Sequence, residues 1–240
     1  MKVVQILGLF NSGTNLLFQI INTLFDVQIG DEGHTLFWKH TVLTDEFSKK
    51  YVKKKNTNVY IVVSKNPYFQ FHSFKKAPYS IRLRNNTNNT IDNFVQKSFY
   101  IVLPRNVITD SSQLSFKHFP HYWNEFHSAT FKYLPQHNTL YVKYEDIVFN
   151  TDQVITQLST ILPLKPQFID NNTLIRSTLN IILDTPAKKS GNPRFGNSAR
   201  QYYTQSNINT LYKPNTFTWI NRELKKQIMN RLNYTFHIAP

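Results

Sequence analysis

The chain has 240 residues and carries 28 lysines and arginines against 14 aspartates and glutamates, a formal net charge of +14. This length is enough for one sizeable hydrophobic core, so we expect a single domain over residues 1–240, and the basic balance suits an anionic ligand. The chain has no cysteine, which excludes a disulfide-stapled scaffold and any thiolate metal or redox site.

The first predicted elements are a strand, a polar turn and a helix. Residues 2–8 form a short apolar run typical of a buried strand, and the next apolar residues recur at helical spacing: Leu16, Leu17, Ile20, Ile21 and Leu24. The turn between them contains Asn11, Ser12, Gly13, Thr14 and Asn15. A strand, a tight turn and a helix N-terminus direct free backbone N–H groups at an anion, and the two hydroxyls add donors. The turn is therefore predicted to bind phosphate.

The spacing of Gly8 and Gly13 matches a Walker loop, but Thr14 stands where that motif has its lysine. Without this lysine we expect a weak grip on the β- and γ-phosphates of a nucleoside triphosphate. A turn rich in Ser and Gly between strand and helix also occurs in many α/β proteins without a phosphate ligand. The turn alone leaves these alternatives open.

The next segment with possible chemistry is Trp38-Lys39-His40. A histidine near its ordinary pKa can take a proton from a hydroxyl, and a neighbouring ammonium can stabilise negative charge on an oxygen. The residues alone assign neither role to His40 or Lys39. The alternative is a strand end with one core aromatic residue and two basic residues facing solvent.

Residues 58–63 form a continuous β-branched and aromatic run, typical of a strand buried on both faces. Lys65 follows directly, Pro67 is placed to open a helix, and Ser73 lies eight positions after Lys65. This puts Lys65 at the carboxyl edge of a strand, where open α/β sheets bind their ligands.

Residues 140–143 form another strand that ends in Tyr144-Glu145-Asp146, whose two carboxylates we interpret as structural groups that order the loop. Amphipathic helices are predicted before it, around residues 123–133, after it, around 154–162, and at the end of the chain, around 224–232. A basic, glycine-bearing stretch runs from Lys188 to Arg200 and has little hydrophobic periodicity.

These segments, in this order, resemble those of the sulfotransferases that use 3′-phosphoadenosine 5′-phosphosulfate (PAPS). The resemblance implies an α/β fold with a P-loop-like parallel sheet flanked by helices, and transfer of a sulfuryl group to a hydroxyl or amine acceptor with release of 3′-phosphoadenosine 5′-phosphate (PAP). It implies that residues 11–15 hold the 5′-phosphosulfate and that Lys65 and Ser73 hold the 3′-phosphate. In the family a late basic loop closes over this phosphate, which makes Arg194 and Arg200 candidates here.

The catalytic assignment also follows from the resemblance, because a Trp-Lys-His segment recurs in a microbial branch of the family. His40 is then the base, and Lys39 stabilises the leaving oxygen. Asn11 stands where the family has Lys or Arg, and Lys39 is placed to compensate for it. Should His40 point away from the 5′-phosphate, Glu32 or Asp31 is the next candidate base.

Two other functions remain open: a phosphotransferase using a nucleoside triphosphate, and a non-catalytic nucleotide-binding member of the fold. The acceptor is not indicated beyond a glycan, a peptide or a small molecule. No helix-turn-helix, zinc-finger or RNP pattern is present, so no nucleic-acid partner is expected. The histidines lack metal-ligand spacing, and no run of about 18 apolar residues or signal-peptide cleavage site occurs. We therefore expect no metal, no membrane span and a cytoplasmic location.

Overall fold

The structure is a computed structural model that describes residues 2–29, 37–52, 58–84, 90–103, 107–110, 114–184 and 202–237. Its strands are β1 (Val3–Gly8), β2 (Gln28–Ile29), β3 (Asn58–Ser64), β4 (Ile81–Leu83), β5 (Phe99–Ile101), β6 (Ser115–Phe116) and β7 (Thr139–Lys143). Its helices are α1 (Thr14–Leu24), α2 (Asp45–Tyr51), α3 (Pro67–Lys76), α4 (Ile91–Val95), α5 (Phe119–Tyr133), α6 (Tyr144–Phe149), α7 (Thr151–Ser159), α8 (Asn172–Asp184), α10 (Gln205–Ile208), α11 (Pro214–Glu223) and α12 (Lys226–Arg231), with short 3-10 turns η1 (Gln136–Asn138) and η2 (Pro166–Phe168).

The central sheet has four parallel strands in the order β2-β1-β3-β7. Every residue of β3 is buried, as its β-branched and aromatic sequence predicts for a strand covered on both faces. The register aligns Gly8 of β1 with Val63 of β3, and Val63 with Val142 of β7. The carboxyl ends of these three strands therefore meet at one edge of the sheet, and the residues that follow them are brought together there.

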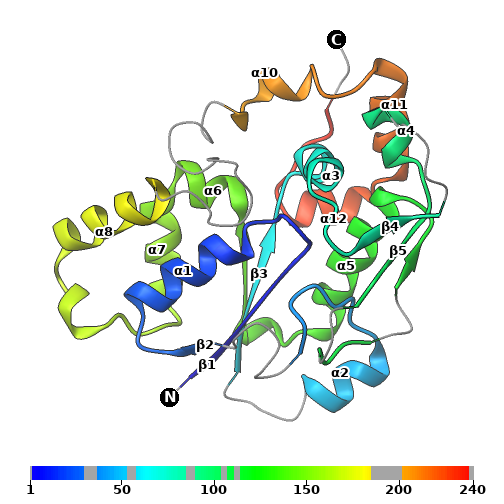
Figure 1. Ribbon diagram of the computed structural model, residues 1–240. Helices are drawn as coiled ribbons and strands as arrows, with labels where there is room; N and C mark the ends of the chain where they lie inside the picture. The colour runs from blue at the N-terminus through cyan, green and yellow to red at the C-terminus, as the bar shows by residue number, and fades with distance from the viewer. Residues whose placement is uncertain are drawn as a thin grey trace.

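Helices flank the sheet on both sides, which confirms the predicted α/β fold class. Figure 1 shows α1, α7 and α8 grouped on one side of the strands and α5 and α12 on the other. Helix α1 buries the predicted apolar stripe, including Leu16, Leu17, Ile20 and Ile21, against this core. Burial of about 25 cal/mol per Å² of apolar surface makes such stripes the main source of stability for a helix of this length.

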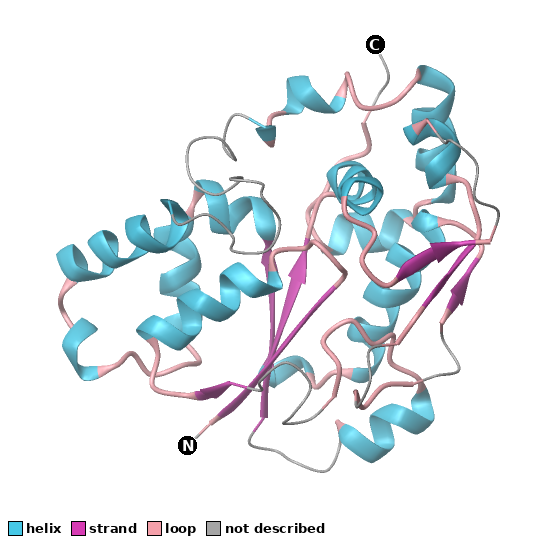
Figure 2. Cartoon of the chain, viewed as in Figure 1, coloured by secondary structure: helices cyan, strands magenta, loops and turns pink. Residues whose placement is uncertain are grey.

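A second, antiparallel sheet has three short strands in the order β4-β5-β6, a feature that the sequence patterns did not predict. It lies apart from the parallel strands, beside α5 (Figure 2). Its buried side joins an aromatic cluster in which the rings of Phe99 and Phe119 stack with centroids 4.3 Å apart. The stacking ties the small sheet to the main core through α5.

The helices predicted around residues 123–133 and 154–162 are confirmed as α5 and α7. The expected terminal helix around 224–232 is wrong in its start: α11 ends at Glu223, Leu224 is extended, and α12 begins at Lys226. The helical spacing of Leu224 and Ile228 therefore does not mark one helix, because Leu224 lies in the link between α11 and α12. None of the helices in the described ranges combines the length and the apolar character needed to cross a membrane.

Candidate functional site

The turn between β1 and α1 has the geometry of an anion site. The N–H of Ser12 donates to the Leu9 carbonyl at 3.1 Å. The N–H of Leu17 donates to the Gly13 carbonyl, also at 3.1 Å. Gly13 precedes the helix with φ of 93°, and no side chain caps this N-terminus. The N–H groups of the first turn, with the positive end of the helix dipole, are thus available to a ligand.

Two glycines make this turn tight. A Cβ on Gly13 would overlap the ring of Tyr144. The φ of Gly13 also lies in the left-handed region, which disfavours any residue with a side chain. A Cβ on Gly8 would collide with the Ser12 hydroxyl and lie 2.8 Å from Cγ2 of Thr14. The Ser12 Oγ is buried and has no hydrogen-bond partner among the residues that the structure describes. An orphaned donor inside a glycine-formed turn fits a phosphate or sulfate ligand.

Asn11 contributes to the turn differently from the sequence expectation. Its backbone has φ of 63°, a conformation that asparagine tolerates better than most residues. Its side-chain amide donates to the carbonyls of Ser73, at 3.3 Å, and Ala77, at 2.8 Å, at the end of α3. The side chain therefore fixes α3 to the turn, while the carbonyl of Asn11 accepts a hydrogen bond from Lys65 at 3.2 Å.

Lys39 lies at the first turn of α1. Its ammonium donates to Oδ1 of Asn15 at 2.7 Å, and its backbone carbonyl accepts from the N–H of Gly8 at 3.0 Å. The structure thus brings the Trp38-Lys39-His40 segment against the turn between β1 and α1 and places the ammonium of Lys39 beside Asn15.

His40 is 7% exposed and packs against Phe10, with ring centroids 4.2 Å apart, and against Trp38, at 5.3 Å. Its Nδ1 lies 2.5 Å from the Gly8 carbonyl oxygen. A carbonyl only accepts, so Nδ1 carries the proton and Nε2 keeps its lone pair. Burial and then the charge of Lys39 lower the pKa of His40 from 6.5 to about 3, against the opposing effect of the Gly8 hydrogen bond, so the ring is neutral at physiological pH.

The Nε2 atom of His40 differs from the ring nitrogens of His127, another buried histidine. Both nitrogens of His127 are fully buried and have no partner among the described residues. Nε2 of His40 has no hydrogen-bond partner in the described part of the chain either, yet it is not among the fully buried atoms. The imidazole beside the turn therefore has a reachable lone pair that can accept a proton, although burial makes it a weaker base than a histidine near its ordinary pKa.

Lys65 and Ser73 come together as their spacing predicts. Lys65 is 3% exposed, and its ammonium donates to Ser73 Oγ at 2.9 Å, to Tyr203 Oη at 2.9 Å and to the Asn11 carbonyl at 3.2 Å. All three acceptors are neutral. No described aspartate or glutamate forms an ion pair with Lys65.

Two tyrosines complete the surroundings of Lys65, and the sequence motifs identified neither as a ligand-binding residue. The ammonium lies 4.7 Å from the ring centroids of both Tyr144 and Tyr203. Because the Tyr144 ring also packs on Gly13, it lies between the turn and Lys65. Both contacts depend on tertiary structure; the only sequence signal was the position of Tyr144 at the end of β7.

Glu145 has the structural role that the sequence predicts. Its carboxylate accepts hydrogen bonds from the Asn66 N–H at 2.9 Å and from the Tyr234 hydroxyl at 3.0 Å. Burial raises the pKa of Glu145, while these hydrogen bonds and the charge of Lys65 lower it. The carboxylate thereby fixes the turn that carries Lys65 into α3.

Arg194 and Arg200 lie outside the described residues, as do the alternative bases Asp31 and Glu32. Among the residues that the structure does describe, no group of three or more His, Asp or Glu side chains is arranged to hold a metal ion.

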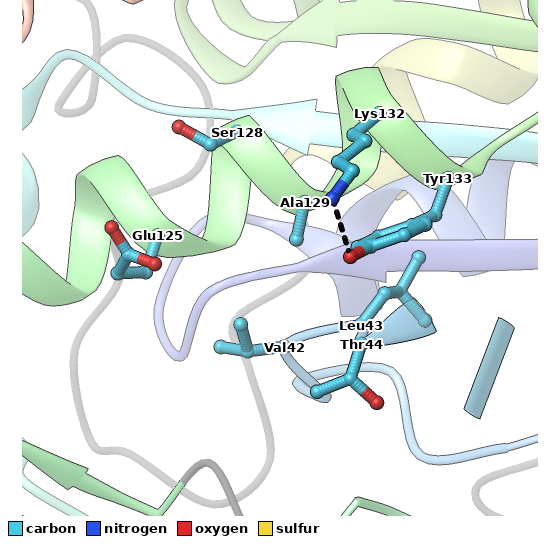
Figure 3. Close-up of a pocket in the computed structure, with 8 residues that line it drawn as sticks. All are labelled: Val42, Leu43, Thr44, Glu125, Ser128, Ala129, Lys132 and Tyr133. Atoms are coloured by element: carbon cyan, nitrogen blue, oxygen red, sulfur yellow. Dashed lines mark hydrogen bonds between the residues drawn. The ribbon is translucent and has the colours of Figure 1, made fainter. Parts of the chain in front are cut away.

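A shallow cleft separates the segment Val42–Thr44 from one face of α5, and none of the predicted site residues lines it. Figure 3 shows Lys132 of that face donating to the hydroxyl of Tyr133, at 2.9 Å. The strand edge that carries Lys65 remains the part of the described chain where charge, orphaned donors and glycines converge.

No protein-family model matches the chain, and no curated protein matches it. Among solved structures, the fold is similar to that of mouse sulfotransferase SULT7A1 complexed with PAP, with a TM-score of 0.45 and 14% sequence identity. The likeness covers 98% of this chain and 90% of that chain.

Proposed function

We propose that this protein binds PAPS and transfers its sulfuryl group to a hydroxyl or amine acceptor. The observation that supports this most strongly is the buried ammonium of Lys65. Moving a charge out of water costs on the order of several kcal/mol unless it is compensated by other groups. The hydrogen-bond acceptors of Lys65 among the described residues are all neutral, and the buried carboxylate of Glu145 acts on it only through space, so a bound anion in direct contact with the ammonium would complete its environment.

A second positive site lies at the same edge of the sheet, at the uncapped N-terminus of α1 with Lys39 beside it. The ring of Tyr144 separates the two sites. A ligand with one anionic group at each end of a ribose suits two separate sites better than a linear triphosphate chain. The absence of a Walker lysine at Thr14 also disfavours a triphosphate.

The residues present fit such a donor. Ser12, Gly13, Thr14 and Asn15 would hold the 5′-phosphosulfate, with Asn11 contributing its backbone, and Lys65 with Ser73 would hold the 3′-phosphate. PAPS, when bound, supplies an activated sulfuryl group. The protein supplies a neutral base in His40, whose Nε2 lone pair takes the proton of the acceptor, and a positive charge in Lys39 near the first turn of α1.

Calorimetric titration of the purified chain with PAP and with ATP tests this proposal. We expect PAP to bind at least about tenfold more tightly, a difference of about 1.4 kcal/mol. Tighter binding of ATP would favour the phosphotransferase and overturn the proposal. Selective binding of PAP without release of PAP from PAPS, across phenol, glycan and peptide acceptors, would favour the non-catalytic alternative.

A further inference from the structure

Each proton of the Lys65 ammonium already has an acceptor in the ligand-free protein. One acceptor is the Asn11 carbonyl, which belongs to the backbone of the turn. The second is Ser73 Oγ, whose own proton goes to the Phe69 carbonyl at 2.8 Å. The Asn11 carbonyl has no proton, and Ser73 Oγ donates to an anion only by turning its proton away from the Phe69 carbonyl.

The third acceptor, the hydroxyl of Tyr203, is different. Its oxygen accepts from Lys65 at 2.9 Å, and within the described residues no acceptor takes its own proton. A phenol that accepts from an ammonium becomes a stronger donor, because hydrogen bonds in a chain polarise one another. Among the described residues, the Tyr203 hydroxyl is therefore the one contact of Lys65 that has a proton for a ligand without first breaking another hydrogen bond.

Aromatic packing fixes the position of this hydroxyl. The Tyr203 ring is 9% exposed and meets Phe69, Tyr144 and Tyr202 edge to face, with centroids 5.0, 5.1 and 4.9 Å away. A donor held by this packing does not have to be ordered when the ligand binds, which lowers the entropic cost of the contact.

We propose that Tyr203 is a further residue of the nucleotide site, and that its hydroxyl donates to the phosphate that Lys65 neutralises. This inference rests on the proposed function and extends it to a residue 138 positions from Lys65 in sequence. The Lys65 charge and the Tyr203 proton then act on the same anion, and Ser73 keeps the ammonium in place.

Titration of the full chain and its Tyr203→Phe variant with PAP and with AMP tests the inference. The variant keeps the ring and removes only the hydroxyl. A hydrogen bond to a charged group predicts a loss of about tenfold in affinity for PAP, and no change for AMP, which lacks the 3′-phosphate. Tyr202→Phe is the matched control, since the neighbouring hydroxyl contacts Nδ1 of His72 instead of Lys65, and its PAP affinity should equal that of the wild type.

Unchanged or tighter PAP binding by Tyr203→Phe would overturn the inference, because the hydroxyl would then be neutral or would compete with the ligand for Lys65. Equal losses for PAP and AMP would overturn it as well, since they would indicate a general change in the site. In both cases PAP selectivity of the wild type would leave the proposed function standing. A wild-type protein that does not bind PAP would overturn both.

Discussion

The ammonium of Lys39 donates to Oδ1 of Asn15 at 2.7 Å, which joins the Trp38-Lys39-His40 segment to the first turn of α1. The sequence has an uncharged residue, Asn11, where a basic one is expected in the turn, and the structure uses the Asn11 side chain to fix the end of α3. The positive charge near the turn therefore comes from a different segment of the chain.

This arrangement predicts that Lys39→Ala lowers kcat by roughly 100- to 1,000-fold, the usual scale for loss of one electrostatic stabiliser of a developing charge. Lys49→Ala, on the exposed face of α2, removes the same charge from the protein and should leave kcat unchanged. Release of PAP from PAPS in the presence of an acceptor provides the measurement. Equal rates for the two variants would show that Lys39 has no role in the chemical step.

His40→Ala should lower kcat by roughly a hundredfold or more, because a general base contributes on this scale. Its affinity for PAP should stay within about twofold of the wild type, because the ring acts on the acceptor. We therefore expect kcat to fall while the KM for PAPS stays unchanged. A large loss of PAP affinity would place His40 in nucleotide binding instead.

The pH dependence of kcat provides a separate test of His40. Burial keeps its pKa at about 3, so the base stays neutral throughout the range in which most enzymes work. We expect initial rates without an acid limb between about pH 5 and 8, in contrast to a solvent-exposed histidine, which titrates near 6.5. An acid limb near pH 6.5 that disappears in His40→Ala would contradict the burial of this ring.

Acid should destabilise the protein through His40 and His127. Burial lowers the pKa of each from 6.5 to about 3, so between these values the unfolded chain binds more protons than the folded one. Their contribution to stability is fully present above pH 6.5 and is lost as the pH falls towards 3. Each histidine adds a slope of up to about 1.4 kcal/mol per pH unit.

Urea unfolding at several pH values tests this, with His127→Leu as the variant, since both His127 nitrogens are buried without a partner in the described ranges. The variant should show a shallower fall in the free energy of unfolding between pH 6.5 and 4. A slope identical to that of the wild type would mean that His127 is not desolvated in the folded state.

Gly13→Ala should lower the free energy of unfolding by at least about 2 kcal/mol, because the left-handed backbone alone costs about 1–2 kcal/mol for a residue with a Cβ. The remaining cost comes from overlap with the ring of Tyr144. Thermal or urea unfolding measures the effect, and adding Tyr144→Ala should remove the overlap part of it. If the two substitutions are additive, the ring does not limit residue 13.

Local sequence patterns were sufficient for β1, β3 and β7, although not for β2, and for the pairing of Lys65 with Ser73, because a strand end and the first turns of the following helix fix both residues. They were insufficient for Tyr203, which reaches Lys65 from 138 residues away through packing on Phe69. They also did not predict that the Asn11 side chain bonds the carbonyl of Ala77, because this contact depends on where α3 ends. Contacts between distant segments follow from the whole core and leave no short-range signal.

The central claim is that Lys65 binds the 3′-phosphate of the nucleotide, and Lys65→Ala tests it most directly. Calorimetry should show PAP binding weakened by about 1.5–3 kcal/mol, the worth of a charge-assisted hydrogen bond, while AMP binds the wild type and the variant equally. Lys75→Ala, an exposed lysine at the end of α3, should change neither affinity and controls for net charge. Equal losses of PAP and AMP affinity in Lys65→Ala, or no loss at all, would contradict the account.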